Sequence, residues 1–272
     1  MKLFVTESGE LKTGWGKLRI KTKTKEKEFP LSKLEAVILL NNLQIPQKAI
    51  EDFRKHNLLT VQVNNDLIRI ITTPKLKKFK FPEPNSYKFY SMIQLKKEEA
   101  LRTLLSFRSA SGTRELRQQN RAFYQNILNK TLNGRAELGN RTIDQLITSE
   151  FLRYVDQFSS VNPKSPELSK FVLFITGLSR ALTAYIMKGE GYTPEEEIVE
   201  KLENLLLPQR LFICAHMLNT GLIDTEELTP KGLTEAGKKI ATKILLEFTY
   251  NGEYLLPVIF TIRKIVGEGK FQ

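Results

Sequence analysis

The chain has 272 residues, 41% of them hydrophobic, which is enough to bury a core in one large domain or two ordinary ones. Lys and Arg number 42 against 30 Asp and Glu, and the formal net charge of +12 favours a nucleic-acid partner, with ordinary solubilising surface chemistry as the alternative. The single cysteine, Cys214, excludes an internal disulfide and a cysteine-based metal cluster, and it predicts a reducing, cytoplasmic location.

Neither a secretion signal nor a membrane span is expected. Glu7 and Glu10 fall where a signal peptide needs an apolar run. The most apolar stretch, residues 171–187, is interrupted by Arg180 and is too short to cross a bilayer.

The first 73 residues predict a small β-rich domain. Short runs of β-branched and aromatic residues alternate with Ser-Gly, Asn-Asn and Asn-Asn-Asp turn signals. One helix interrupts them, with Pro46 in its first turn and Ala49, Ile50 and Phe53 on its apolar face. The expected strands are LFVT (3–6), KLRIKTKTK (17–25), LEAVILL (34–40), LLTVQV (58–63) and LIRIITT (67–73).

A row of lysines is expected on one face of the second strand or its hairpin. Lys21, Lys23, Lys25 and Lys27 alternate with other polar residues, and alternate residues of a strand share a face. Two interpretations are open. The row could protect an edge strand against aggregation, or it could form a track for phosphates.

The composition changes after residue 73. The segment 73–87 has three prolines, four lysines and no sustained period, so residues 74–87 predict a linker. Beyond it nearly every segment has helical spacing, and residues 88–272 predict an all-α domain. The fold class is therefore α+β with two domains, the smaller one β-rich and the larger one all-α. Helices are expected near 88–107, 111–131, 141–159, 166–188, 194–206, 208–219, 232–248 and 253–266.

The charges are segregated along the chain. Residues 1–90 hold 18 basic and 9 acidic side chains, a net +9. Residues 102–141 hold eight basic side chains and two acids, whereas residues 190–227 hold nine acids and two basic side chains. This segregation predicts a basic surface for a phosphate backbone and a separate acidic region.

One predicted helix carries arginines on a single face. Arg114, Arg117 and Arg121 recur at i, i+3 and i+7, opposite Leu116 and Phe123. Few acids lie nearby in the sequence, so contact with phosphates is favoured over a merely solvated face. The predicted DNA-binding residues are Arg108, Arg114, Arg117, Arg121, Arg135 and Arg141.

Glu150 interrupts an apolar stripe. In the helix near 141–159, Ile147, Phe151 and Tyr154 belong to one stripe, and Glu150 lies inside it. A carboxylate turned toward a core is costly unless it is paired or binds a metal, so Glu150 is a candidate catalytic and metal-binding residue. A structural salt bridge to an arginine is the alternative.

A cluster of glutamates follows Pro194. Acids in the first turn of a helix complement its dipole and need no function. Glu196, Glu200 and Glu203, however, share one face, and they could hold a divalent cation, Mg²⁺ or Mn²⁺, together with Glu150 if the helices pack together.

The two histidines match no metal motif. His56 ends the helix of the β-rich region, where a cation is favourable, and His216 is expected off the core face of its own helix. Zinc spacings, a nucleophile elbow, a Walker loop and a glycine-rich fingerprint are absent from the sequence, which argues against a serine or cysteine hydrolase.

Two non-enzymatic functions are alternatives. The segment GLIDTEELTPKGLTEAGKKIATKIL (221–245) is similar to the end of a winged-helix module, with LTPKG as a short wing, which would suit a DNA-binding regulator. The acidic region 190–227 could instead dock a basic partner and make the chain a structural adaptor.

The order of features resembles the family of CRISPR-associated spacer integrases (Cas one). That family begins with strand, turn, strand, then PLS, a Val-rich strand and a helix, and here MKLFVTESGELKTGWGKLRIK, FPLSKLEAVILLNNLQIPQKAIEDF and LLTVQVNND are similar to that pattern. The segment PQRLFICAHMLNTGLIDTEELTPKGLTEAGKKIATKIL is similar to its last helices. The layout covers nearly the whole chain, and the clear motifs cover half of it.

The resemblance implies a homodimer formed through the β domains, which inserts DNA fragments into a repeat array with a small partner nuclease (Cas two). The implied chemistry is attack of a 3′-hydroxyl on a backbone phosphate beside a metal held by a glutamate, a histidine and an acid. ITSEFLRY would supply Glu150 after a two-residue slip, and Glu200 or Glu203 could replace the acid. No histidine occurs between residues 150 and 210. We therefore expect a divergent DNA-binding member of prokaryotic adaptive immunity whose endonuclease or integrase chemistry is weakened or lost.

Overall fold

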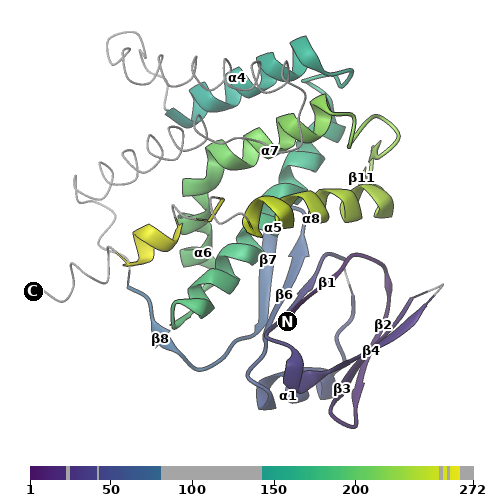
Figure 1. Cartoon of the computed structure of the whole chain (residues 1–272), viewed down its shortest axis with the longest axis vertical. Coiled ribbons are helices and arrows are strands. Elements are labelled where there is room, and N and C mark those ends of the chain that lie inside the picture. The colour runs from purple at the N-terminus through teal and green to yellow at the C-terminus, as the bar shows by residue number, and fades with distance from the viewer. Residues whose placement is uncertain (23–24, 42, 81–142, 251–253, 256–257, 264–272) are drawn as a thin grey trace, which may run out of the picture. The chain divides into compact units, whose positions relative to one another are not determined.

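The computed structural model describes residues 1–22, 25–41, 43–80, 143–250, 254–255 and 258–263 (Figure 1). The chain divides into two compact units. Unit 1 is Met1–Lys80 with Leu173–Leu202, and unit 2 is Phe81–Val172 with Glu203–Gln272. The predicted helices at 88–107 and 111–131 lie outside the described residues.

Unit 1 contains a four-stranded sheet in the order β1–β5–β6–β7 (Figure 1). Strands β1 (Lys2–Val5), β5 (Ala36–Leu39) and β6 (Leu59–Asn64) are parallel, while β7 (Leu67–Thr72) pairs antiparallel with β6 and forms one edge. Parallel neighbours need a crossover, which helix α1 (Gln47–Lys55) provides between β5 and β6.

A second, antiparallel sheet of unit 1 has the order β2–β3–β4. Strands β2 (Gly9–Gly14) and β3 (Lys17–Thr22) are joined by Trp15 and Gly16, whose φ angles of 55° and 70° suit a tight hairpin turn. Strand β4 (Glu26–Pro30) completes the sheet. The sequence did not predict β2 or β4, because GELKTG and EKEFP contain few β-forming residues and gain their structure by pairing with β3.

The core of unit 1 lies between the two sheets and α1. All four residues of β5 are buried, as the continuous apolar run AVIL predicts for a strand covered on both faces. The core is made by Val5, Leu11, Leu18, Ile20, Leu31, Leu34, Val37, Leu39, Leu43, Ala49, Phe53 and Leu58.

The predicted lysine row on one face is wrong. Lys21 lies opposite Glu26, whereas Lys27 lies opposite Ile20, whose side chain is buried. Because residues opposite each other across a strand pair share a face, Lys21 and Lys27 project from opposite faces of the hairpin. The register of the hairpin, which the lysine spacing alone could not reveal, separates them.

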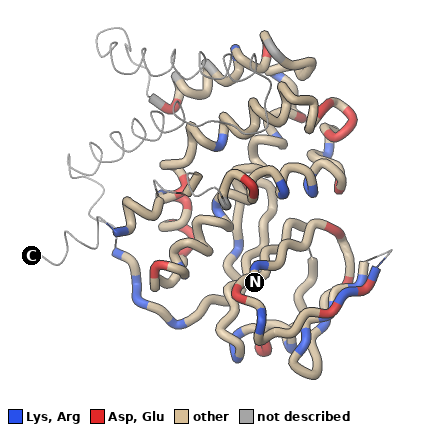
Figure 2. Tube along the Cα trace, viewed as in Figure 1, with Lys and Arg blue, Asp and Glu red and all other residues tan. Residues whose placement is uncertain are grey.

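Strands β2, β3 and β4 carry residues of both signs of charge (Figure 2). The Lys17 ammonium lies 2.9 Å from a carboxylate oxygen of Glu28, and Arg19 Nε lies 3.2 Å from one of Glu26. Strand β3 is central, so protection of an edge strand does not explain its own cations, whereas Lys27 lies on the edge strand β4, where that interpretation stays open. Lys17, Arg19, Glu26 and Glu28 form a ladder of ion pairs.

Helix α5 (Pro166–Gly189) supplies residues from Leu173 onward to unit 1. A Cβ atom at Gly177 would lie 1.9 Å from the carbonyl oxygen of Asn65 in the β6–β7 turn, so this approach requires glycine. Farther along the helix, the Tyr185 hydroxyl donates a 2.6 Å hydrogen bond to Glu35. These contacts fix α5 along the four-stranded sheet.

The length of α5 corrects one expectation. The apolar stretch 171–187 belongs to a 24-residue helix that is long and apolar enough to cross a membrane by length and composition alone. However, 72% of its most apolar window is buried in the structure, which is typical of a core helix.

The first part of the predicted linker is packed within unit 1. Strand β8 (Lys77–Lys78) pairs in parallel with β9 (Tyr192–Thr193). The ring of Phe79 is buried and meets Tyr192 edge to face, with centroids 5.1 Å apart. The predicted linker and domain boundaries remain predictions.

Unit 2 is mainly helical in the part that the structure describes. Its α4 and α7 pack together, and Tyr154 Oη accepts a 2.9 Å hydrogen bond from Asn219 Nδ2 between them. Its elements are α4 (Ile143–Phe158), the first turns of α5, the 3₁₀ turn Asn204–Leu206, α7 (Leu207–Asn219), β10 (Leu228–Thr229), β11 (Gly232–Leu233), α8 (Glu235–Tyr250) and a helical segment at 258–263.

Helix α7 ends in a Schellman motif. Gly221 has a φ of 67°, and the backbone N–H groups of Gly221 and Leu222 donate to the carbonyls of Leu218 and Met217. The Asn-Thr-Gly of the sequence therefore ends the helix.

The mixed α+β class, with β strands first and a helical region after them, is confirmed, while the two-domain organisation stays a prediction.

Candidate metal-binding and nucleic-acid-binding residues

The predicted DNA-binding arginines lie outside the described residues. Their role therefore stays a prediction. They are Arg108, Arg114, Arg117, Arg121, Arg135 and Arg141.

Glu150 lies on helix α4 in unit 2. The apolar stripe around it is confirmed, because Ile147, Phe151 and Tyr154 are all buried. Burial raises the pKa of Tyr154 to about 12. The side chain of Glu150 is outside the described part of the chain, and its role stays a prediction.

Glu200 forms an ion pair within unit 1. It lies on α6 (Glu196–Glu203), and its carboxylate is 2.7 Å from Nη2 of Arg180. The Arg180 side chain is 10% exposed in the middle of α5, and Nη1 also donates to the carbonyl oxygen of Asp66 at 2.8 Å. A buried guanidinium needs such partners, so Glu200 has a structural role. A metal ion could bind Glu200 only by displacing Arg180 from it.

Glu203 forms an ion pair within unit 2. Its side chain is 0% exposed, and Oε1 accepts a hydrogen bond from Nη1 of Arg210, which is itself 9% exposed. Burial opposes the charge of Arg210, but the Glu203 carboxylate more than offsets this and holds the pKa of Arg210 above its ordinary value. The pair is almost entirely buried, in contrast to the pair of Glu200, whose carboxylate is 55% exposed.

The described acids do not fit a divalent metal site. Glu200 and Glu203, both predicted ligands, are each held by an arginine, and Glu196 accepts a 2.8 Å hydrogen bond from the backbone N–H of Ile70. Within the described ranges, no three His, Cys, Asp or Glu side chains are grouped so that they could hold a metal ion. The prediction of a metal at Glu150, Glu200 and Glu203 stays a prediction.

His216 is buried, and the expectation that it lies off the core face is wrong. Helix α7 is buried on every side from Pro208 to Leu218, and His216 is 3% exposed. Its ring stacks on Phe212 at 6.2 Å and meets Phe248 edge to face at 5.8 Å. Its Nδ1 atom has no hydrogen-bond partner among the described residues. A helix buried all round has no polar face for the sequence pattern to reveal.

Burial of His216 predicts a pH-dependent stability. Burial lowers the pKa of His216 below 6.5, so the unfolded state binds this proton before the folded state does. As the pH falls below about 6.5, the free energy of unfolding should therefore fall by up to about 1.4 kcal/mol per pH unit until the folded pKa is passed. Urea unfolding at pH 7.5 and 5.5 measures this loss.

His216→Phe removes the titrating group and should flatten this pH dependence. An equally steep loss of stability in His216→Phe would contradict the assignment.

The predicted wing is a short hairpin. β10 and β11 pair antiparallel, and Thr229 Oγ1 donates a 2.6 Å hydrogen bond to the carbonyl of Gly232 across the turn. Each strand has two residues, and α8 begins directly after it.

Neither a protein-family model nor a curated protein sequence matches the chain. Solved structures do. A casposase bound to an integration product superposes with a TM-score of 0.56 over 90% of this chain and 82% of its own, at 12% identity. A CAS1 protein from Thermotoga maritima superposes with a TM-score of 0.57 over 97% of this chain and 95% of its own, at 14% identity.

The chain has the Cas1 fold. A third solved structure, a Cas6-RT-Cas1–Cas2 complex, gives a TM-score of 0.59 over 97% of this chain at 12% identity, and the match spans 34% of that longer chain. The resemblance inferred from the sequence is thereby confirmed at the level of the fold. The Cas1 fold includes the strands of unit 1 and the helices of unit 2, and it does not favour the winged-helix alternative.

Proposed function

We propose that the chain is a divergent, DNA-binding protein of the spacer-acquisition integrase type, acting in the cytoplasm, whose metal-dependent phosphodiester transfer is weakened or lost. The observation that carries the proposal is the fold. It matches a Cas1 protein over nearly the full length of both chains and a casposase solved on an integration product.

The charge distribution supports DNA as the ligand. The net charge is +12, and residues 102–141 hold eight basic side chains against two acids. A phosphate backbone is bound mainly through such cations. A homodimer through the β-rich region and a small partner nuclease complete the proposal, and one neighbour of this fold is a Cas1–Cas2 complex.

Two observations support weakened transfer. The sequence has no histidine between residues 150 and 210, so the ligand set implied by the resemblance is incomplete. Glu200 and Glu203 are each paired with an arginine, and a carboxylate in an ion pair must lose that partner before it can bind a cation.

A strand-transfer assay tests the proposal. The chain is incubated with a labelled duplex carrying free 3′-hydroxyls and a supercoiled plasmid, in Mg²⁺ or Mn²⁺. We expect DNA to be bound and little or no joined product to form. Robust joining that Glu150→Ala abolishes would show that catalysis is intact and that this part of the proposal is wrong.

A further inference from the structure

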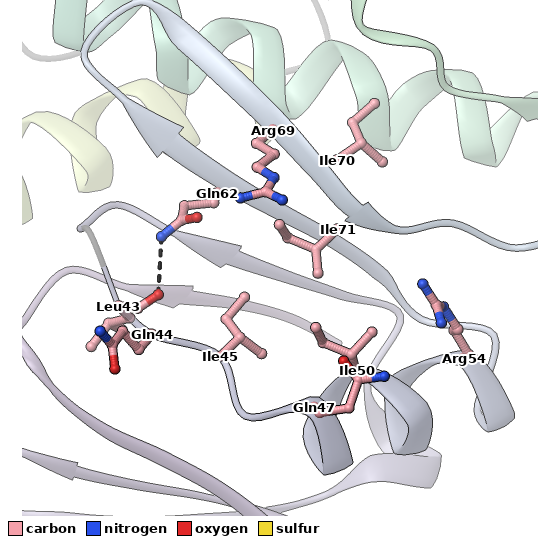
Figure 3. A pocket seen from close by; sticks show the side chains of 10 residues that line it. All are labelled: Leu43, Gln44, Ile45, Gln47, Ile50, Arg54, Gln62, Arg69, Ile70 and Ile71. Atoms are coloured by element: carbon pink, nitrogen blue, oxygen red, sulfur yellow. Dashed lines mark hydrogen bonds between the residues drawn. The ribbon is translucent and has the colours of Figure 1, made fainter.

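A groove of about 610 Å³ opens on unit 1 (Figure 3). Its walls come from α1 with the preceding residues 43–45 on one side and from strands β6 and β7 on the other. Volumes of roughly 300–1,000 Å³ are typical of small-molecule sites. The groove therefore has the size of a ligand site.

Two guanidinium groups line this groove from opposite walls. Arg54 lies on α1 and Arg69 on β7. Both side chains are exposed, and neither makes an ion pair or hydrogen bond with another residue that the structure describes. Acidic side chains are also missing from the described lining. Two like charges around one hollow favour an anion between them.

A second positive potential lies at the N-terminus of α1, at the other end of this helix from Arg54. The helix begins at Gln47, which lines the groove. Its N-cap is Pro46, no side chain caps this end, and its first turn has no acid. Free backbone N–H groups and the helix dipole attract phosphate at such an end.

The rest of the lining is apolar or carboxamide. Ile45, Ile50 and Ile71 provide aliphatic surface (Figure 3). The Gln62 side chain is fixed by a 3.1 Å hydrogen bond from Nε2 to the carbonyl of Leu43, which leaves its Oε1 as an acceptor. Aliphatic side chains suit the faces of a flat base, and carboxamides can both donate to and accept from its edge.

We propose that this groove binds a nucleotide, with its phosphate between Arg54 and Arg69 and its base over the isoleucines. The inference goes beyond the proposed function, which requires no nucleotide in this groove. An extended acidic peptide fits less well, because such peptides gain affinity by pairing with a strand edge. On β7 the N–H of Ile70 already donates to Glu196 at 2.8 Å.

The nucleotide could be free or part of an unpaired DNA end, and both present the same chemistry. Calorimetric titration of the full-length chain distinguishes them. The probes are adenosine 5′-monophosphate, adenosine, and a 5′-phosphorylated tetranucleotide. The monophosphate should bind at least about tenfold more tightly than adenosine, because the nucleoside lacks the charge that the arginines recognise. Tighter binding of the tetranucleotide would assign the site to DNA ends, and tighter binding of the monophosphate would assign it to free nucleotides.

Variants test the location. Arg54→Ala and Arg69→Ala should each weaken binding of the monophosphate about tenfold. The matched control is Lys55→Ala, which removes an exposed cation next to Arg54 that does not line the groove, and it should bind like the wild type. Far-ultraviolet circular dichroism checks that each variant is folded.

Three results would overturn the proposal. Binding of the monophosphate could be absent at millimolar concentration. It could be equally tight in the double variant Arg54→Ala/Arg69→Ala. The double variant could instead change the oligomeric state, which would make the groove an interface between two copies. If a variant is unfolded, the proposal is decided by the wild-type chain alone, from its affinity for adenosine 5′-monophosphate compared with its affinity for adenosine.

Discussion

Glu203→Ala should lower the free energy of unfolding by about 3–5 kcal/mol, because it leaves the buried charge of Arg210 without its partner. The Arg210 guanidinium is 9% exposed, and its Nε atom has no hydrogen-bond partner among the described residues, so the charge of Arg210 depends strongly on the Glu203 carboxylate. Urea unfolding followed by circular dichroism measures the loss.

The matched control is Glu197→Ala on the same helix. Glu197 is exposed and pairs with Lys201 one turn later, so its removal should leave the urea midpoint unchanged. Removing both charges, in Glu203→Leu/Arg210→Met, should recover most of the stability that Glu203→Ala loses. A Glu203→Ala variant as stable as the wild type would show that the pair does not hold this unit together.

Replacing Arg114, Arg117 and Arg121 together by glutamine should weaken binding to duplex DNA about a hundredfold at low salt, or roughly 0.9 kcal/mol per arginine. Each phosphate contact that is lost also removes a released counterion. The slope of log K against log salt concentration should therefore become shallower by up to about 2.7. Fluorescence anisotropy with a labelled duplex between 50 and 200 mM salt measures both quantities.

A triple variant with the same change in net charge is the control. Lys48, Lys55 and Lys75 are exposed in unit 1, and their replacement by glutamine should change the affinity and the slope much less. Equal losses in the two triple variants would mean that the net charge, and not the arginine face, determines binding.

Local sequence patterns predicted most of the regular elements. The apolar run AVIL became the buried strand β5, and helical spacing placed α4, α5, α7 and α8 close to their observed bounds. Strands β2 and β4 were missed because their residues favour strands weakly and their structure depends on pairing with β3. Pairing between two segments leaves no hydrophobic periodicity in the sequence of either segment.

Contacts between segments that are distant in the sequence also explain why the surroundings of the candidate site residues were not predicted. Glutamates 200 and 203 stood out by their spacing, but their partners Arg180 and Arg210 are set by how helices pack, which spacing on one helix does not encode. The groove was missed because Arg54 and Arg69 lie 15 positions apart on α1 and β7. Its only signal was the net charge of +9 in residues 1–90.

The most direct test of the central claim is one reaction that reports both binding and joining. Wild-type chain, a labelled duplex with free 3′-hydroxyls, a plasmid target and Mn²⁺ are combined at 50 mM salt and analysed on native and denaturing gels. We predict a shifted complex that dissociates steeply as salt is raised, with little or no joined product. A chain that gives no shifted complex at this low salt concentration would contradict the account.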